Sequence, residues 1–587
     1  MIAMTYPRFI AAACLALVAL DARGQEITQV PVETFELANG MKFLVVPRPE
    51  LTTVSAGWVA HVGSANERPG ITGLSHFFEH MMFKGSHAIG TTNIERDLEI
   101  IEEQEILQEQ IRAIYRKQRE RYRLGEIEDP FDADARPPEL IELEHRFDEL
   151  VEAQRELMVK DEFDKLYTEA GASGMNAFTS EDVTVYFITV PANKLELWFW
   201  MESTRLLKPV FREFYSERDV VHEERRLRTE STPTGKFDEL FSAMFWESHP
   251  YSWPVVGWPS DLRVYSLAQA REYYDTYYAP GNLTAAIVGN FDVAEAKILA
   301  ERYFGRLPAA ASTPPDVVTL EMPQSAEKRM DATCDCQPQI ELRYHTVPFR
   351  HRDSYALDVL ANILNGRSGR LHKALVLEQE IAVHAGAGQD SRKWAGSFSL
   401  LAETKGDATP AVLQLALEEE LRKIREGPIP EREIQKVKNQ ITASSYRRLA
   451  SGFFLLLQLL IYDGLGDWNY INEWAEKTLA VTVDDVKRVT TTYFEPSNRA
   501  VAHYYRKEGS TSVELPTELE GLPPQMQQRI MSQLEHIRAS ENLEELKGML
   551  EQLPARFEQA PPPAQKALPL LVRSVEERIA ELEGGAR

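Results

Sequence analysis

Cysteine is scarce in this chain of 587 residues, which contains three. Cys14 lies near the N-terminus, and Cys334 and Cys336 stand in the segment ATCDCQPQ. No second cysteine pair completes a four-cysteine metal site, and a disulfide across a single residue would be strained. The sequence therefore excludes a disulfide-rich scaffold, and it favours two strand residues without chemistry at positions 334 and 336.

Positive charge is also in short supply. The chain has 65 Lys and Arg against 90 Asp and Glu, a formal net charge of −25. A nucleic-acid-binding protein needs a basic face to neutralise phosphates, so this balance argues against that class. It does not identify a partner, because a solvated acidic surface explains it equally well. The length predicts about four domain-sized units.

Long uncharged apolar runs are confined to the N-terminal segment, which argues against a membrane span elsewhere. That segment has Arg8, an apolar stretch from Ile10 to Leu20, and small residues ahead of Gln25. The pattern is typical of a cleaved secretory signal peptide over residues 1–24; a buried helix or a retained anchor is the alternative. We therefore expect an exported protein, with the periplasm as its compartment.

The patterns that follow predict a first α/β domain over residues 25–307. Alternating apolar residues around Asn39–Gly40 indicate a strand hairpin, and the apolar spacing in GLSHFFEHMMFKG (73–85) indicates a helix. Two long charge-rich segments between 94 and 169, separated by prolines, indicate an inserted helical hairpin. Docking a partner is one use for such a hairpin, but a solvated insertion explains its composition better.

A Pro- and Ala-rich stretch predicts a linker at 308–325. Beyond it, VTTTYFEPSNRAVAHYY resembles YYDTYYAPGNLTAAIVG from the first domain, with Pro496 answering Pro280 at an offset of 496 − 280 = 216 residues. This repeat predicts a second α/β domain over 326–510, so that two homologous α/β domains stand in tandem. We expect a helical C-terminal extension over 511–587.

Three residues of the expected helix at 73–85 have the spacing of a metal site. Helical geometry places His76 and His80 one turn apart on one face, with Glu79 beside them. Two such imidazoles can bind one Zn²⁺, and the carboxylate can take a proton from a water whose pKa zinc lowers toward ~7. The spacing alone also fits a solvated helix face that carries two histidines.

Catalytic zinc needs a third protein ligand and an open coordination position. The segment SERDVVHEERRLRTE offers Glu217 and Glu224, which are seven residues apart and so share a helix face. A charged helix surface is the simpler account of either glutamate taken alone.

Three motifs follow one another along the chain in this order: HFFEHMMFKGS, NAFTSEDVTVYF and ERDVVHEERR. HxxEH is the inverted zincin order. Together the motifs resemble the pitrilysin/insulinase family of zinc metallopeptidases, which includes the mitochondrial processing peptidase and its bacterial counterparts. The resemblance runs from about Thr34 to about Tyr505. It implies a zinc endopeptidase that cleaves peptides or unfolded segments in a closed, clamshell-like chamber. The two α/β domains are expected to form one half of that chamber.

The resemblance also implies roles for single residues in the catalytic first domain. His76 and His80 match the zinc-binding histidines, and Glu224 matches the third ligand. Glu79 matches the general base, and Glu217 matches an acidic residue that supports the site.

A further motif of the resemblance concerns substrate. Asn176 and Ala177 match the strand that, in this family, pairs with an extended peptide by strand addition. They are therefore the expected substrate-binding residues.

The second domain departs from the family pattern. Active relatives receive from the far half of the chamber an arginine and a tyrosine seven residues apart, but the aligned residues here are Val376 and Val383, whose side chains donate no hydrogen bond. We therefore expect the metal-bearing subunit of a heterodimer whose homologous partner supplies that Arg and Tyr. One alternative is a homodimer that uses Arg367 or Arg370, and another is a non-catalytic assembly subunit of the same family.

Overall fold

The structure of the chain is a computed structural model. It describes residues 29–132, 136–310 and 312–507, and beyond them 519, 522, 524–540, 542–558, 565 and 567–584. The expected signal peptide (1–24) and the expected boundary at 511 lie outside the described residues. By its contacts the chain divides into two compact units, 1–507 and 508–587.

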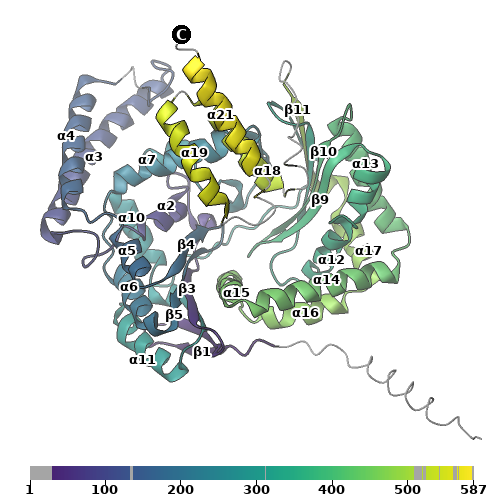
Figure 1. The fold of residues 1–587 in the computed structure, drawn as a ribbon, viewed down its shortest axis with the longest axis horizontal. Coiled ribbons are helices and arrows are strands. Elements are labelled where there is room, and N and C mark those ends of the chain that lie inside the picture. The colour runs from purple at the N-terminus through teal and green to yellow at the C-terminus, as the bar shows by residue number, and fades with distance from the viewer. Residues whose placement is uncertain are drawn as a thin grey trace, which may run out of the picture. The chain divides into compact units, whose positions relative to one another are not determined.

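A six-stranded sheet lies at the centre of the first domain (Figure 1). Its order is β1-β2-β6-β3-β5-β4; β2 and β6 are parallel, and all other neighbours are antiparallel. The strands are β1 (Glu33–Glu36), β2 (Lys42–Pro47), β3 (Thr53–Ala60), β4 (Ser173–Thr179), β5 (Thr184–Pro191) and β6 (Leu283–Gly289). The hairpin expected at Asn39–Gly40 joins β1 to β2, and the φ of Gly40, 91°, is one that glycine tolerates.

Helices and short helical turns surround this sheet. The helices are α2 (Leu74–Met81), α3 (Ile94–Arg123), α4 (Pro138–Leu157), α5 (Glu162–Glu169), α6 (Leu195–Leu207), α7 (Phe214–Arg225), α8 (Gly235–Phe245), α9 (Pro259–Leu262), α10 (Leu267–Tyr277) and α11 (Val293–Tyr303). The short turns are η1 (Ser64–Asn66), η2 (Ala192–Lys194), η3 (Arg226–Glu230), η4 (Pro250–Ser252), η5 (Pro280–Asn282) and η6 (Phe304–Arg306).

The inserted helical hairpin consists of α3 and α4, with α5 following as a separate short helix. Leu107 and Ile111 of α3 belong to one buried cluster with Leu140 and Leu143 of α4, so the two helices are held together by their own small core. Pro138 stands at the start of α4, where its missing N–H costs nothing.

The second domain is built on a five-stranded sheet of order β7-β11-β8-β10-β9. Its strands are β7 (Lys328–Cys334), β8 (Gln339–Thr346), β9 (Ala382–Ser391), β10 (Gly396–Thr404) and β11 (Arg499–Arg506). Its helices are α12 (Ser354–Leu364), η7 (His372–Glu378), α13 (Pro410–Glu426), α14 (Glu431–Ala450), α15 (Gly452–Leu465), α16 (Tyr470–Ala480), α17 (Val483–Tyr493) and η8 (Pro496–Asn498).

The two sheets repeat one topology, which confirms the two homologous α/β domains in tandem. Without β1, each sheet has the order first, fifth, second, fourth, third strand of its domain, and in each only the first and fifth strands are parallel. Asn282 in η5 donates to Tyr277 O (2.9 Å), and Asn498 in η8 donates to Tyr493 O (2.8 Å). The repeat seen around Pro280 in the sequence is therefore a repeated turn that leads into the fifth strand.

Each domain covers the other's sheet with a helix. α15 of the second domain packs on β3, β5 and β6 of the first, where Leu456 and Leu460 lie in one buried cluster with Val59 and Val185; Figure 1 shows α15 beside β3 and β5. At Gly57 of β3 a Cβ atom would lie 3.0 Å from Leu460 Cδ1 and 2.4 Å from a backbone oxygen, so the close approach needs glycine.

The reciprocal contact is made by α8 of the first domain. Its Phe241 and Phe245 form one buried cluster with Ala500, Ala502 and Tyr504 of β11 in the second sheet. The connection between the domains has no helix or strand among its described residues between η6 and β7.

The cysteines correct an expectation from the sequence. Cys334 and Cys336 form a disulfide, whereas the sequence favoured two strand residues without chemistry. β7 ends at Cys334, and the bend that follows brings the two Cα atoms to 5.2 Å, within the range that a disulfide spans. The second cysteine is therefore not a strand residue.

Among the described residues, no single helix is both long and apolar enough to cross a membrane. The pair α14 and α15 passes such a test together by length and composition only, with a bend of 105° between them. The apolar residues of α15 that account for this are those buried against the first sheet.

The second unit contains α18 (Pro524–Ala539), α19 (Leu543–Glu558) and α21 (Leu568–Gly584). Leu534, Leu546, Leu571 and Val575 belong to its own buried cluster, so this segment is helical, as expected.

The contact between α15 and the first sheet generates a stability prediction. Leu460→Ala removes a fully buried side chain between the domains and is expected to destabilise the protein by about 2–5 kcal/mol. Leu415→Ala, at a leucine that is 68% exposed, is the matched control and should change stability by less than about 0.5 kcal/mol. Equal shifts of the two variants in urea denaturation would contradict this account of the interface.

Candidate active site

The helix α2, which carries the HxxEH motif, begins at a buried carboxylate. Glu67 accepts hydrogen bonds from the backbone N–H groups of Gly73 and Ser75, each 2.6 Å long. Such bonds satisfy amide groups that a helix start leaves without partners. Burial raises the pKa of Glu67 to about 8, although these bonds act in the opposite direction. The start of α2 is thus fixed from outside the helix.

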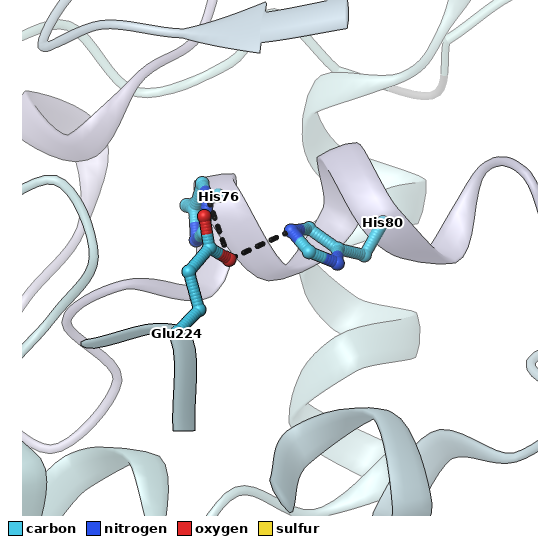
Figure 2. A group of neighbouring side chains, drawn as sticks. All are labelled: His76, His80 and Glu224. Carbon is cyan, nitrogen blue, oxygen red and sulfur yellow. Dashed lines mark ion pairs between the residues drawn. The ribbon is translucent and has the colours of Figure 1, made fainter. Parts of the chain in front are cut away.

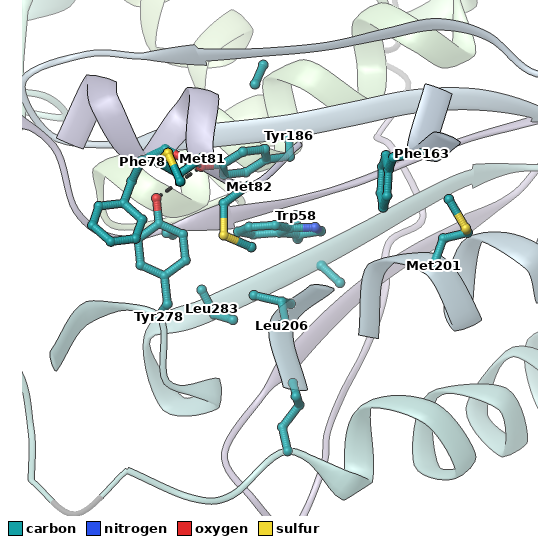
Figure 3. Close-up of a cluster of buried hydrophobic side chains, with 14 of the residues drawn as sticks. Trp58, Phe78, Met81, Met82, Phe163, Tyr186, Met201, Leu206, Tyr278 and Leu283 are labelled. Atoms are coloured by element: carbon teal, nitrogen blue, oxygen red, sulfur yellow. Dashed lines mark hydrogen bonds between the residues drawn. The ribbon is translucent and has the colours of Figure 1, made fainter. Parts of the chain in front are cut away.

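One face of α2 is fixed by the core of the first domain. Phe77, Phe78 and Met81 are buried, and Tyr186 of β5 donates from its hydroxyl to Phe78 O (3.2 Å). Figure 3 shows Phe78 and Met81 of this helix beside Tyr186 and Tyr278, which share a further hydrogen bond of 3.0 Å. Because that face is committed to the core, the polar residues of the motif must lie on the other.

The end of α7, where Glu224 lies, is anchored to the same region. Arg225 is buried and binds both carboxylate oxygens of Glu239 (2.6 and 2.7 Å) and Gly257 O (3.0 Å). A Cβ atom at Gly257 would lie 2.2 Å from Thr72 O, so this loop packs directly on the residues before α2. The start of α2 and the end of α7 are therefore held by one loop.

The expected ligands His76, His80 and Glu224 come together (Figure 2). Glu224 Oε2 lies 3.7 Å from His76 Nε2 and 3.3 Å from His80 Nε2. Two ligand atoms about 2.1 Å from one tetrahedral ion lie roughly 3.4 Å apart. Glu224 Oε2 is also buried and accepts no hydrogen bond. This donor set, with its buried acceptor, fits a zinc ion.

Glu217 contacts His80 at Nδ1, the ring nitrogen that does not face Glu224. Its Oε1 is 2.9 Å from His80 Nδ1, and its Oε2 is 2.6 Å from Lys84 Nζ, which also contacts Glu213 at 3.0 Å. A carboxylate at Nδ1 sets the tautomer of a histidine and leaves Nε2 free for a metal. Lys84 and His80 lower the pKa of Glu217 in spite of its burial, so the carboxylate is charged. Glu217 therefore orients His80.

The two histidines differ in protonation. Burial and the neighbouring His80 lower the pKa of His76 to about 4. Burial also lowers the pKa of His80, but the carboxylates of Glu217 and Glu224 outweigh it and raise it to about 9. Without a metal, one histidine is thus neutral and the other charged near pH 7.

Glu79 stands between the expected metal ligands and the edge of the sheet. Burial raises its pKa, and Thr179 of β4 donates to its Oε2 (2.7 Å). β4 is the last strand of the sheet order, so one edge of its backbone pairs with no other described strand. Asn176 and Ala177 lie on β4, paired on the inner side with Phe187 and Tyr186 of β5. The expected base and the expected substrate strand are therefore adjacent.

Sequence reasoning missed three residues that touch this group: Lys84, Thr179 and Arg228. Arg228 lies 2.5 Å from Glu224 Oε1. Arg228 stands four residues after Glu224, a helical spacing that could have indicated this contact. Lys84 follows the end of α2 and meets Glu217, which is distant in sequence, so no local spacing indicated it. Glu223, the neighbour of Glu224, is instead 58% exposed and pairs with Arg226 (2.8 Å).

The positions where the family expects Arg and Tyr lie in the second domain. Val376 in η7 packs against that domain's core, and Val383 on β9 is 52% exposed. Arg370 pairs with Glu433 (2.7 Å), whereas Arg367 lies exposed in the turn after α12. None of the four belongs to the group around His80.

Comparison with known proteins bears on these residues. Residues 42–104, which include the HxxEH motif, match the family model described as Insulinase (Peptidase family M16), and residues 265–441 match Peptidase M16 inactive domain. The chain is 24% identical over 501 residues to the zinc protease PqqE of Helicobacter pylori, across 83% of this chain and 96% of that protein. Two separate segments of the chain are therefore similar to the insulinase (M16) family of peptidases.

Solved structures show the same fold as this chain. A protease from Helicobacter pylori matches with a TM-score of 0.66 at 22% identity, over 81% of this chain and 99% of that one. The periplasmic protease PqqL of Escherichia coli matches with a TM-score of 0.60 at 16% identity, over 82% of this chain and 48% of that one. This chain thus corresponds in fold to about half of the longer PqqL chain.

The contact between Lys84 and Glu217 generates a prediction. Lys84→Met removes the cation that holds Glu217 against His80, and is expected to weaken Zn²⁺ binding by roughly tenfold or more. Lys160→Met changes an exposed lysine near the same site and should leave zinc affinity unaltered. Competition with a chelator measures both, and equal affinities would exclude a role for Lys84.

Proposed function

We propose that the chain is a zinc-dependent endopeptidase that cleaves peptides or unfolded polypeptide segments. The observation that carries this proposal is the group formed by His76, His80 and Glu224, with Glu79 between it and an open strand edge. Relatives named zinc proteases support the same reaction class.

The residues divide the chemistry between them. A bound zinc ion would supply a Lewis acid that lowers the pKa of water and polarises a carbonyl. Glu79 Oε2 is held by Thr179, which leaves Oε1 free to take a proton from the attacking water and pass it to the departing amine. Its raised pKa suits a group that must bind and release a proton near neutral pH.

A substrate would bind as an added strand on β4, beside Asn176 and Ala177. Next to Glu79 and His80 opens a cavity of about 740 Å³, whose lining includes the apolar residues Phe83, Met158 and Val159. Met158 and Val159 follow the inserted hairpin, so the insertion contributes one wall. The same lining includes charged residues such as Lys84, Arg155 and Glu213, so a side chain next to the cleaved bond would meet both apolar and charged groups there.

Export to the periplasm belongs to the same proposal. The signal-like pattern of residues 1–24 supports it, and one fold neighbour is described as a periplasmic protease.

A second candidate function is that of a non-catalytic assembly subunit. The match of residues 265–441 to a family model described as an inactive domain favours it. That match covers the end of the first domain and most of the second, and contains none of His76, Glu79, His80 or Glu224. We therefore rank the peptidase first.

The test of the proposed function is a pair of substitutions. Glu79→Gln is expected to keep zinc and lose peptide hydrolysis by at least about a hundredfold, because an amide cannot accept the proton. Glu224→Ala is expected to lose most of its zinc, because two histidines leave the ion under-coordinated. Metal analysis beside a peptide assay distinguishes them; near-normal turnover of Glu79→Gln would contradict the assignment of the base.

Zinc binding should release a defined number of protons from the two histidines. Both histidines must be neutral to bind, but the pKa of His76 is already lowered to about 4, whereas that of His80 is raised to about 9. Between about pH 5 and about pH 8 each zinc should therefore displace one proton, from His80, and zinc affinity should rise about tenfold per pH unit. Calorimetry in buffers of different ionisation enthalpy counts the protons; two or none would contradict this protonation scheme.

Full activity is proposed to require a second, homologous polypeptide. Val376 and Val383 offer no donors where the family uses Arg and Tyr, and losing one donor to developing charge costs about 2.7–4 kcal/mol. The chain corresponds to 48% of the PqqL chain, so a second half of the same fold would complete a chamber. A homodimer using Arg367 is the alternative.

A peptide-cleavage assay decides between the heterodimer and the homodimer. It compares the chain alone with a mixture of the chain and a homologous chain that carries the Arg and Tyr. We expect the mixture to be roughly a hundredfold or more faster. Equal rates would exclude the heterodimer.

A further inference from the structure

The internal repeat gives the metal site a counterpart in the second domain. α2 lies between the second and third strands of the repeated topology, and α12 lies there in the second domain. α7 is the second helix after β5, and α14 is the second helix after β10. Where α12 meets α14, a groove of about 950 Å³ opens. We name it the second-domain groove; its polar lining includes Asp358, Asn362, Arg367, Gln440, Ser444 and Arg447.

The groove retains the spacing of the metal site but not its chemistry. His76 and His80 are four residues apart, as are Asp358 and Asn362 on α12. The pair Phe77–Phe78 is buried between the histidines, and Val359–Leu360 is buried between the polar residues of α12. Ala361 stands where α2 has Glu79. With neither imidazole nor base, this position cannot reproduce the metal site.

Positive charge takes the place of the metal ligands. Where α7 contributes glutamates, α14 contributes Arg447 and Arg448 to the groove, and Arg367 lies in the turn that follows α12. Neither Arg367 nor Arg447 has an ion-pair partner among the described residues. These guanidinium groups stand out in a chain whose net charge is −25.

A single acidic residue, Asp358, lines the groove together with three arginines. Asp358 is largely enclosed next to Trp474, and burial raises its pKa to about 6. The three arginines therefore exceed the negative charge of the groove at neutral pH.

The floor of the groove is aromatic. Phe349 lies 4.5 Å from Tyr470 and 5.8 Å from Tyr462, measured between ring centroids, and Arg448 lies over Trp474 at 5.7 Å. Aromatic walls with a few convergent charged groups are typical of sites that bind a ligand with one polar end. A guanidinium pairs with a carboxylate through two parallel hydrogen bonds, so a carboxylate matches the free arginines.

We propose that the second-domain groove binds a carboxylate of a peptide substrate, either an Asp or Glu side chain or the C-terminal carboxylate. This inference rests on the proposed peptidase function and adds a substrate class to it, namely peptides with an acidic residue or a free C-terminus within reach of the groove. The duplicated domain would then serve as a substrate anchor in which guanidinium groups replace the metal.

The experiment measures peptide binding separately from cleavage. The full-length Glu79→Gln chain, loaded with zinc, is titrated into three short fluorescent peptides. The first has an internal Glu and a free C-terminus. The second differs from it by Gln in place of that Glu, and the third differs from it by an amidated C-terminus. Loss of the groove-bound carboxylate is expected to weaken binding about tenfold. The Gln peptide loses affinity if the side chain binds, and the amidated peptide loses it if the C-terminus binds.

A matched pair of charge reversals locates the carboxylate. Arg447→Glu in the Glu79→Gln chain should weaken binding of the preferred peptide by about tenfold or more and abolish the difference between peptides. Arg432→Glu makes the same change at an exposed arginine of α14 that does not line the groove, and should have little effect. Arg367→Glu is the second groove variant should Arg447→Glu fail to fold.

The outcomes separate this inference from the proposed function. Equal affinity for all three peptides, or equal effects of Arg447→Glu and Arg432→Glu, would overturn the anchor even if the wild-type chain cleaves peptides. A carboxylate preference that Arg447→Glu removes supports the anchor, even if the wild-type chain with zinc proves unable to cleave.

Discussion

Both sheets of the first unit must be covered on two faces, and this constraint determines how the two domains fit together. One face of the first sheet is covered by α15 of the second domain, and α8 of the first domain covers the second sheet. Burying such apolar faces is the main favourable contribution to folding. The exchange of helices makes the duplicated domains one unit, as their contacts indicate. The helices α2 and α7, which carry His76, His80 and Glu224, take no part in these two contacts.

The position of the proposed metal ligands follows from buried polar contacts around α2 and α7. Glu67 fixes the start of α2, and Arg225 ties the end of α7 to the loop at Gly257, which packs on the residues before α2. The two ligand-bearing elements thus share one support. Around them runs a chain of charges from Lys84 through Glu217 to His80, in which each group determines the protonation of the next. Such preorganisation is what a metal site requires from its surroundings.

Local periodicity was sufficient to predict part of this arrangement. Helical spacing places His76, Glu79 and His80 together, because one turn separates them. Glu224 follows 144 residues after His80 (224 − 80), so only the resemblance to a family could connect the two; the structure brings them within 3.3 Å. Lys84 was not predicted because a lysine is usually solvated and its partner Glu217 lies 133 residues further along the chain (217 − 84). The bond between Cys334 and Cys336 depends on a bend that a strand pattern does not reveal.

The exchanged helices were beyond prediction for a different reason: an apolar helix such as α15 shows that it will be buried but not which sheet will bury it. Their arrangement has a consequence for the covalent connection between the domains. If the chain were divided within 308–325 into two polypeptides, each fragment would expose a sheet face that its own helices do not cover. Neither fragment would be stable alone, and together they would reassemble by fragment complementation. The linker supplies proximity and a few contacts, such as those of Glu321 with the backbone of Ser248 and His249 and of Gln324 with Arg499 O, and a gene split at this point would encode an obligate pair.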